Sequence, residues 1–259
     1  MPIIEDHPIT KPLKENAVLW KYMDIPSFLS LLVNQSLTFV RADLMEDKYE
    51  GTIPKMTASM IDRDAIERIN AGTLDPEFLN FSKIVEGPRN TTYLNCWCKE
   101  NHQMIHMWKI YSKENGVAIE TNYKRLKESL ETDEYIYPTE IEYIDFDTDS
   151  INLQSNAFTV YTIKRKEYKS EHELRLMIHL PNLVEDQLYK PKEDEPILPD
   201  PKRNILYEET QVVKCKINPI KLISKIYISP FAPKWYHQLI TKIVNDYGLN
   251  EISILQSDL

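Results

Sequence analysis

The residue types best suited to chemistry in this sequence occur together in the segment Lys164–Leu176, KRKEYKSEHELRL. If Glu171–Leu180 is a strand, alternation of its side chains places Glu171, Glu173 and Arg175 on one face and an apolar row on the other. Two carboxylates on one face repel, which raises the pKa of one of them, and Arg175 can hold one in a fixed rotamer. Such a carboxylate could orient a ribose hydroxyl, polarise a nucleophile or bind a metal; a solvent-facing strand with cross-strand ion pairs is the structural alternative.

A second candidate is Arg41, which ends the predicted strand Leu37–Arg41. A guanidinium at this position could bind a diphosphate through two hydrogen bonds. The loop that follows, ADLMEDKYEG, is acidic but lacks the spacing of oxygen ligands of an EF-hand. We interpret its acids as structural, and the alternative role for Arg41 is an ion pair with Asp43.

The third candidate is the block WCKENHQMIHMWKIYSKENGVAIE. On a helix over Gln103–Ser112, i, i+4, i+7 spacing places Met104, Trp108 and Tyr111 on one stripe, close to Ser112. Aromatic residues at this spacing usually pack in a core, although they also offer flat stacking surfaces. The cysteines and histidines of this block do not match the usual zinc spacing, because C-x-C is too tight, and we expect no metal.

Length and composition limit the class of protein. The chain has 259 residues and a formal charge of −9, which argues against broad nucleic-acid binding but not against a local basic cleft. Its five glycines form neither a GxGxxG motif nor a Walker A loop. Three cysteines, no secretory signal and no apolar run of ~18 residues favour a cytoplasmic protein without a membrane segment.

The pattern of elements predicts one elaborated domain over residues 1–259, with an N-terminal extension over 1–17 and a long mobile loop over 181–204. Strands are predicted at Val18–Met23, Leu37–Arg41, Thr91–Cys98, Gly116–Thr121, Glu140–Phe146, Glu171–Leu180, Val212–Ile217, Lys225–Ser229 and Ile252–Leu255. Helices are predicted after Asp24 and at Pro54–Asn70, Pro76–Lys83, Gln103–Ser112, Tyr123–Glu131 and Pro233–Tyr247. This mixture without a βαβ rhythm predicts an α+β fold, with a mainly antiparallel or mixed sheet flanked by short helices.

Five blocks in this order resemble a bacterial family of unknown function: LWKYMDIPSFLSLL, LTFVRADLMEDKYEG, CWCKENHQMIHMWKIYSKENGVAIE, KRKEYKSEHELRL and IYISPFAPKWYHQLI. More distantly, the chain resembles the ADP-ribosyltransferase fold, which includes DNA-modifying toxins. That resemblance implies NAD as a possible substrate and Glu173 or Glu171 as the catalytic acid. The residues that would contact NAD are Tyr22, Arg41, Trp108, Tyr111, Ser112 and Arg175.

Three functional hypotheses follow. The first is an NAD-dependent ADP-ribosyltransferase-like enzyme with a role as a toxin or in phage defence, whose acceptor, protein or nucleic acid, is open. It expects Arg41, Tyr111 and Glu173 to converge on one pocket. The second is a non-catalytic module that binds a nucleotide or a protein. The third is a metal-dependent nuclease that uses carboxylates of the acidic loop and the late strand: Asp43, Asp47, Glu171 and Glu173.

Overall fold

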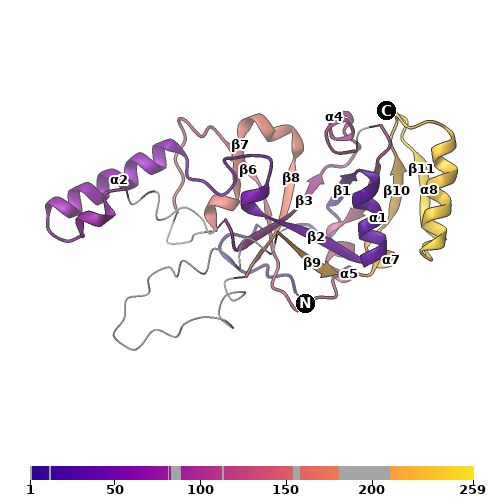
Figure 1. Ribbon diagram of the computed structural model, residues 1–259, viewed down its shortest axis with the longest axis horizontal. Helices are drawn as coiled ribbons and strands as arrows, with labels where there is room; N and C mark the ends of the chain where they lie inside the picture. Colours follow the sequence, from indigo (N-terminus) through magenta and orange to yellow (C-terminus); the bar gives the residue numbers. More distant parts are fainter. Residues whose placement is uncertain are drawn as a thin grey trace.

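The computed structural model describes residues 2–11, 13–80, 82, 89–112, 114–153, 158–180 and 211–259. The predicted loop over 181–204 lies outside the described residues. Among the described residues, no helix combines the length and the apolar character that a bilayer span requires. Figure 1 shows a central sheet between α8 at one end and the projecting helix α2 at the other.

A mixed, mainly antiparallel sheet forms the centre of the fold, as the sequence predicts. Its strands are β1 Val18–Met23, β2 Ser36–Arg41, β3 Thr92–Lys99, β4 Val117–Asn122, β5 Tyr137–Glu140, β8 Glu173–His179, β9 Val212–Lys216, β10 Lys225–Ile228 and β11 Ser253–Gln256. The order is β11-β10-β4-β1-β3-β2-β9, with β8 and β5 branching from β3. All these pairings are antiparallel except that of β10 with β11. A separate parallel pair joins β6 Glu142–Ile144 to β7 Ile163–Arg165.

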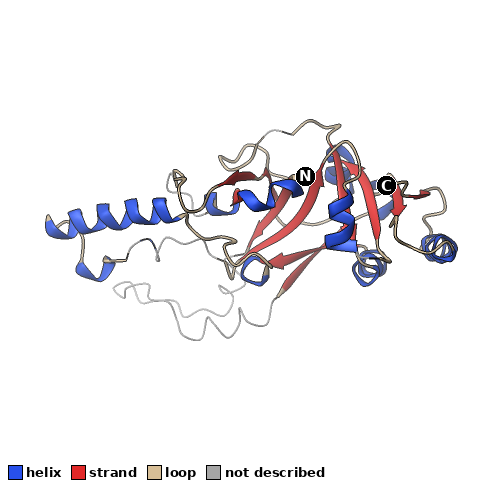
Figure 2. Ribbon diagram, turned by 90° about the horizontal axis from the view of Figure 1, so that it is seen from above, coloured by secondary structure: helices blue, strands red, loops and turns tan. Residues whose placement is uncertain are grey.

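Short helices surround the sheet. The α-helices are α1 Ile25–Asn34, α2 Lys55–Asn70, α4 Ile105–Met107, α5 Tyr123–Ser129, α7 Pro219–Leu222 and α8 Trp235–Asp246. The 3-10 turns are η1 Ala42–Leu44, η2 Pro76–Phe78, η4 Thr159–Tyr161 and η5 Lys166–Glu171, and η3 Trp108–Ser112 is a π-helical turn. The view in Figure 2 shows these helices flanking the strands, with α2 extending away from them.

Helix α1 shows how local sequence and packing combine. Asp24 caps its first turn by accepting a hydrogen bond from Ser27 N at 2.9 Å, which satisfies one of the unpaired amides of a helix start. The buried stripe of Phe28, Leu31 and Leu32 faces the core, as its i, i+3, i+4 spacing predicts. Each of these side chains contributes roughly 1.5–3 kcal/mol through burial. The helix therefore fixes the positions of β1 and β2, which it connects.

The two faces of the sheet are covered differently. The larger apolar core contains side chains of α1, α5 and α8, such as Phe28, Leu126 and Ile240, packed with the strands. On the other face, Trp108 of η3 packs over β1 and β4, and Tyr161 of η4 packs over β3 and β8. This second face therefore has two separate apolar clusters instead of one.

Strand β3 is the point at which the sheet divides. Along one edge it pairs with β8 from Thr92 to Cys98. On the other edge its end pairs with β1 (Leu19↔Lys99 and Trp20↔Cys98), whereas its start pairs with β2 (Val40↔Leu94 and Arg41↔Tyr93). The strands β1 and β2 therefore diverge and leave Asn95–Trp97 at the base of a fork.

Side chains bridge the fork where strand pairing stops. Lys21 Nζ donates to Cys96 O at 2.9 Å, and Asn95 Nδ2 donates to Thr38 O at 2.8 Å. Asn95 Oδ1 accepts a hydrogen bond from Trp97 Nε1 at 2.8 Å. Because buried backbone groups need hydrogen-bond partners, these contacts stabilise the opening between the two strands.

Four predicted elements differ in the structure. The predicted helix Pro76–Lys83 is a 3-10 turn at Pro76–Phe78, and residues 81 and 83 lie outside the described residues. The predicted strand Glu140–Phe146 contains only the last residue of β5 and the short strand β6, because β5 pairs with β8 and β6 pairs with β7. The predicted helix Gln103–Ser112 is a single turn, α4, followed by η3. The predicted strand Glu171–Leu180 begins at Glu173, because Glu171 ends η5 and His172 adopts a left-handed conformation with φ 47°.

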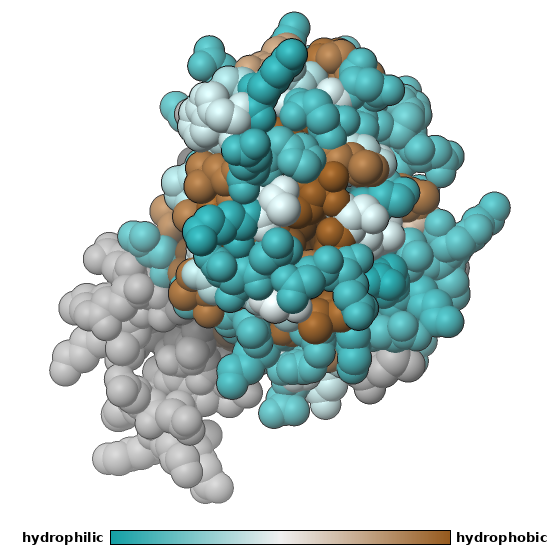
Figure 3. Space-filling model, turned by 90° about the vertical axis from the view of Figure 1, so that its right-hand side faces the viewer, coloured by the Kyte–Doolittle hydropathy of each residue, from teal (hydrophilic) through white to brown (hydrophobic). Residues whose placement is uncertain are grey.

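Helix α8 closes one end of the molecule. It buries Tyr236, Ile240 and Val244 against the sheet, whereas Trp235 and Leu239 remain exposed. Figure 3 shows this end, where hydrophobic side chains lie among a majority of hydrophilic ones.

Candidate functional site

A cavity of about 200 Å³ lies at the fork of the sheet. Its walls come from both diverging strands and from β3, and its other side is formed by Tyr111 of η3 and by Lys164, Glu171 and Glu173. Trp20, Tyr22, Met107 and Cys98 add an apolar and aromatic wall. The cavity therefore joins flat hydrophobic surfaces to a pair of carboxylates.

A wider groove of about 600 Å³ continues from this cavity toward α1. The cavity and the groove share the lining residues Lys21, Tyr22, Thr38, Val40 and Tyr111. The groove is lined by hydroxyl groups, including those of Ser27, Ser30 and Ser36, and by Asp24 and Pro26 at the start of α1. An elongated ligand could place one part in the narrow cavity and the other in the groove.

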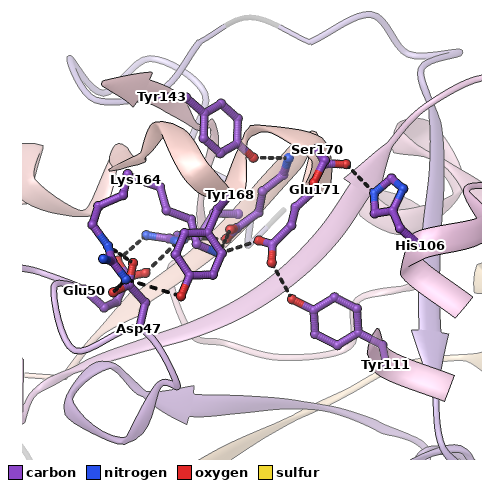
Figure 4. Close-up of polar contacts among 12 residues, drawn as sticks. Asp47, Glu50, His106, Tyr111, Tyr143, Lys164, Tyr168, Ser170 and Glu171 are labelled. Carbon is purple, nitrogen blue, oxygen red and sulfur yellow. Dashed lines mark hydrogen bonds and ion pairs between the residues drawn. The ribbon is translucent and has the colours of Figure 1, made fainter. Parts of the chain in front are cut away.

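A line of charged side chains runs from the interior to the cavity. Arg175 donates to Glu50 through Nη1 at 2.6 Å and Nη2 at 2.9 Å, and to Glu173 through Nε at 2.7 Å. Lys164 Nζ lies between the two late glutamates, bonded to Glu171 and, at 3.0 Å, to Glu173. Tyr111 OH donates to the other oxygen of Glu171 at 2.8 Å, and Figure 4 shows these two side chains pointing toward each other.

The line has more negative than positive groups. It holds the three carboxylates of Glu50, Glu173 and Glu171 and the two cations Arg175 and Lys164. Glu171 is the outermost of the three carboxylates, because it contacts Tyr111 at the cavity wall. The unbalanced negative charge therefore lies toward the cavity.

Pairing sets the protonation of the inner groups. Burial alone raises the pKa of Glu173, but Arg175 and Lys164 outweigh it and lower this pKa to about 2. Burial raises the pKa of Glu50 above its usual value, and Arg175 opposes that shift. Burial lowers the pKa of Lys164, but the two late glutamates raise it overall, so the ammonium stays charged.

The two cysteines near the site are poor nucleophiles in this environment. Burial and the nearby carboxylate of Glu173 raise the pKa of the Cys96 thiol. Burial, with Glu100 as a smaller cause, raises the pKa of Cys98 to about 12. Because the thiolate is the reactive form, neither residue is activated.

The aromatic residues predicted to contact NAD have different positions. Tyr22 and Tyr111 line the cavity. Trp108 lies behind Tyr22, with ring centroids 5.1 Å apart in an edge-to-face contact, and is fully buried. Ser112 is buried as well and donates to Trp108 O at 2.7 Å. It packs against Gly116, where an added Cβ would lie 2.1 Å from Ser112 Cβ.

The two arginines predicted to contact NAD are engaged inside the protein. Arg41 is only 6% exposed and makes a bidentate contact with Asp43, at 2.7 and 3.1 Å. Alternation along β2 explains its absence from the cavity lining, because Thr38 and Val40 face the cavity and Phe39 faces the core. Arg175 is fully buried between Glu50 and Glu173. The expected convergence of Arg41, Tyr111 and Glu173 therefore holds for the last two only.

The structure adds Lys21, which the sequence reasoning did not select. Its ammonium lies 5.2 Å from the centre of the Trp97 ring and bonds to Cys96 O and, at 3.5 Å, to Asn95 Oδ1. Among the described residues, no carboxylate pairs with it. The signal in the sequence was its place in the apolar row of β1, between Leu19 and Met23.

The carboxylates proposed for a metal-dependent nuclease are paired with cations. Asp43 binds Arg41, and Asp47 binds Arg165 at 2.9 Å. The ammonium of Lys164 lies between Glu171 and Glu173, the place that a shared metal would take. In the described part of the chain, no group of three or more His, Cys, Asp or Glu residues is arranged to hold a metal ion.

The sequence profile of a family described as "Protein of unknown function (DUF2971)" matches residues 107–176, which confirms over this segment the resemblance to a family without an assigned activity. The matched segment includes Tyr111, Lys164, Glu171 and Glu173. Comparison with curated proteins gives no significant match.

Among solved structures, the chain is similar to "Thermus sp. 2.9 DarT in complex with carba-NAD+". The TM-score is 0.34 and the sequence identity 10%, over 94% of this chain and 96% of that chain. A similarity of this size carries no argument about the activity of the present chain, so a function has to rest on the site itself.

Proposed function

We propose that the cavity and groove bind NAD and that the chain catalyses ADP-ribosyl transfer, with Glu171 as the catalytic carboxylate. The observation that carries the proposal is the carboxylate of Glu171, which lies at an aromatic cavity with one oxygen on Tyr111 and the other on Lys164. Both contacts fix its rotamer before a ligand enters. A fixed carboxylate of this kind is what a reaction through a positively charged sugar centre requires.

The shape of the site matches a dinucleotide. The narrow cavity has aromatic walls for the nicotinamide ring, contributed by Trp20, Tyr22 and Tyr111. The wider groove has hydroxyl groups along one side, which can bond to a ribose or an adenine. A ligand with two flat groups and a flexible link between them fits both parts at once.

The reaction is a substitution at the ribose carbon C1′. The bond from C1′ to the nicotinamide nitrogen breaks, and its electron pair leaves with neutral nicotinamide. A nucleophilic oxygen or nitrogen of the acceptor forms the new bond to C1′, and the acceptor releases its proton to Glu171 or to solvent. Glu171 accepts a hydrogen bond from a ribose hydroxyl and stabilises the positive charge that develops on the ring.

Glu173 supports Glu171 in this proposal. Both oxygens of Glu173 are bonded inside the protein, one to Arg175 and one to Lys164. Through Lys164 it holds the carboxylate of Glu171 in place. Arg175 holds Glu173 in turn and is itself held by Glu50, so Glu173, Arg175 and Glu50 are positioning residues.

Release of nicotinamide from labelled NAD tests the proposal. The purified protein is incubated with NAD labelled in the nicotinamide ring, with and without protein, RNA and single-stranded DNA as acceptors. We expect release by the wild type and a loss of about 10²–10³-fold in Glu171→Gln, the size typical of removing one preorganised stabilising group. Lys225→Met, which removes an ion pair with Glu120, is the matched control, because neither residue of this pair lines the cavity.

Three outcomes would contradict the proposal. One is the absence of nicotinamide release with every acceptor, although NAD binds; this favours a non-catalytic nucleotide-binding module. Another is equal release by the wild type and Glu171→Gln. The third is magnesium-dependent cleavage of nucleic acid that persists without NAD, which favours a nuclease. A role as a toxin or in phage defence stays a prediction. Labelling of a cell extract with labelled NAD would identify the acceptor of the ADP-ribosyl group.

A further inference from the structure

We propose that Lys21 binds the anionic link of the ligand, so that the fork of the sheet is a site for a phosphate or diphosphate between two uncharged groups. The inference rests on the proposed function for the identity of the ligand but names a residue and a chemistry that the function does not require. It also moves the expected diphosphate contact from Arg41 to Lys21.

The position of Lys21 is the first support for this role. Lys21 belongs to the residues that line both the cavity and the groove, so its side chain stands where the two spaces meet. A ligand that extends from one space into the other has to pass this side chain. The middle of such a ligand, and not its ends, is therefore the part that Lys21 can contact.

The hydrogen-bond donors of Lys21 are the second support. An ammonium has three N–H donors, and Lys21 bonds to two acceptors, Cys96 O and Asn95 Oδ1. Both acceptors are neutral, so the positive charge has no carboxylate partner among the described residues. In contrast, Lys164 has two carboxylates and Arg41 has one.

The polar groove beside Lys21 is the third support. Ser36 lines the groove and is 4% exposed, yet its Oγ has no hydrogen-bond partner among the described residues. A buried hydroxyl without a partner costs free energy unless a ligand or water satisfies it. Lys21 and Ser36 thus offer a charge and a hydroxyl along one surface.

The protonation of Lys21 is sensitive to what occupies the fork. Burial lowers its pKa to about 8, and the nearby carboxylate of Glu173 opposes this shift only in part. An anion beside the ammonium stabilises the charged form and raises the pKa again. Binding of the anion is therefore strongest below pH 8 and weakens as the pH rises above 8, because the amine loses its proton.

The test compares a probe that contains the diphosphate and a second ribose with a probe that lacks both. ADP-ribose and adenosine are titrated into the wild type, Lys21→Met, Lys21→Arg and the control Lys225→Met by isothermal titration calorimetry at pH 7. We expect Lys21→Met to weaken ADP-ribose binding by about 10- to 100-fold, the range of a charge-assisted hydrogen bond, and to leave adenosine binding within about twofold. Lys21→Arg keeps the charge and retains more affinity for ADP-ribose than Lys21→Met.

A second measurement needs no substitution. The affinity of the wild type for ADP-ribose should fall between pH 7 and pH 9, and the affinity for adenosine should stay constant. Thermal unfolding of Lys21→Met checks that the variant folds. Met is apolar and close to Lys in length, so we expect a folded protein.

The results separate this inference from the proposed function. If ADP-ribose binding depends on Lys21 but NAD is not consumed, the proposed function fails and the role of Lys21 stands. If NAD is consumed and Lys21→Met binds ADP-ribose as the wild type does, the inference is wrong and the function stands. Equal weakening of both probes would show a structural role for Lys21, and no binding of ADP-ribose to the wild type at pH 7 would also overturn the inference.

Discussion

The inner and outer ends of the charged line at β8 differ in how completely their polar groups are used. At the inner end, Arg175 bonds to Glu50, Glu173 and the carbonyl of Tyr161, and its side chain is fully buried. At the outer end, Glu171 contacts Tyr111, which is 40% exposed, and Lys21, which lines the same cavity but lies outside the charged line, bonds only to neutral acceptors. Both ends contain the residue types of a catalytic site.

The difference shows which charges support the fold and which can meet a ligand. A buried cation whose hydrogen bonds all end on carboxylates and carbonyls has nothing left to offer a ligand. A cation at a cavity wall that has no carboxylate partner is stabilised when an anion binds beside it. Residue type alone therefore does not identify a functional site, whereas the use of each donor and acceptor does.

The largest effect should come from breaking the inner end. In Arg175→Met, Glu50 and Glu173 lose their main cation and remain buried with like charges. We expect the free energy of unfolding to fall by about 3–5 kcal/mol, because one partner of a buried pair is removed. Urea denaturation measures it; Lys225→Met, which removes a partly exposed pair, should lose no more than about 1 kcal/mol. Equal losses in the two variants would remove the distinction between the two ends.

The outer end should respond more in activity than in stability. Glu171→Gln keeps the shape of the side chain, and Lys164 keeps Glu173 as an ionised partner, so we expect a smaller loss of stability than in Arg175→Met. Glu173→Gln, at the inner end, should lose more stability, because Arg175 then has only Glu50 as an ionised partner. Urea denaturation of both variants, measured beside nicotinamide release, shows whether the two glutamates divide the roles in this way.

The free energy of unfolding at acidic pH should depend on the ionisation of Glu173, at the inner end. The pKa of Glu173 is about 2 in the folded protein and 4.5 as its usual value, so its contribution to stability is complete above pH 4.5 and is lost as the pH falls toward 2. This contribution is on the order of 3 kcal/mol. Glu50, with its raised pKa, changes stability in the opposite direction and offsets part of the loss.

Urea denaturation at pH 6, 4.5 and 3 measures this loss of stability. The profile of Glu173→Gln should be flatter than that of the wild type over the same range. If the two profiles have the same slope, Glu173 does not depend on its cations as the structure indicates.

The smallest effect should come from Tyr111→Phe. This variant removes the hydroxyl that donates to Glu171 and keeps the ring at the cavity wall. We expect nicotinamide release to fall by less than about tenfold, since Lys164 still holds Glu171, and a single neutral donor contributes about 1 kcal/mol. A loss as large as that of Glu171→Gln would mean that Tyr111 itself acts on the substrate.

Much of the fold could be predicted from periodicity. The apolar stripe of α1 and the shared face of Glu173 and Arg175 follow from spacing alone, and the 2.7 Å contact between these two confirms the second. Glu171 reaches Lys164 beside Glu173 although it lies outside the strand, because η5 and the left-handed His172 turn the chain there. The predicted grouping of the two glutamates was therefore right for a different geometric reason.

The site could be predicted only in part. Tyr22, Tyr111, Glu171 and Glu173 line the cavity, whereas Trp108, Ser112, Arg41 and Arg175 do not. Arg41 and Lys21 are both cations in line with an apolar row of a strand, Arg41 at the end of its row and Lys21 within its row, so the sequence gives them a similar signal. What separates them is Asp43, which binds Arg41, and the fork, which leaves Lys21 at an opening.

By itself, the sequence determined the α+β class, most strand positions and the residue types of the site, because these depend on contacts between neighbours along the chain. Only the tertiary structure decided that β1 and β2 diverge from β3 and which cations are neutralised. Arg175 pairs with Glu50, which lies 125 residues away in the sequence. The cavity exists because β1 and β2 pair with the same edge of β3. Such long-range pairing depends on the whole packed fold, and no local pattern encodes it.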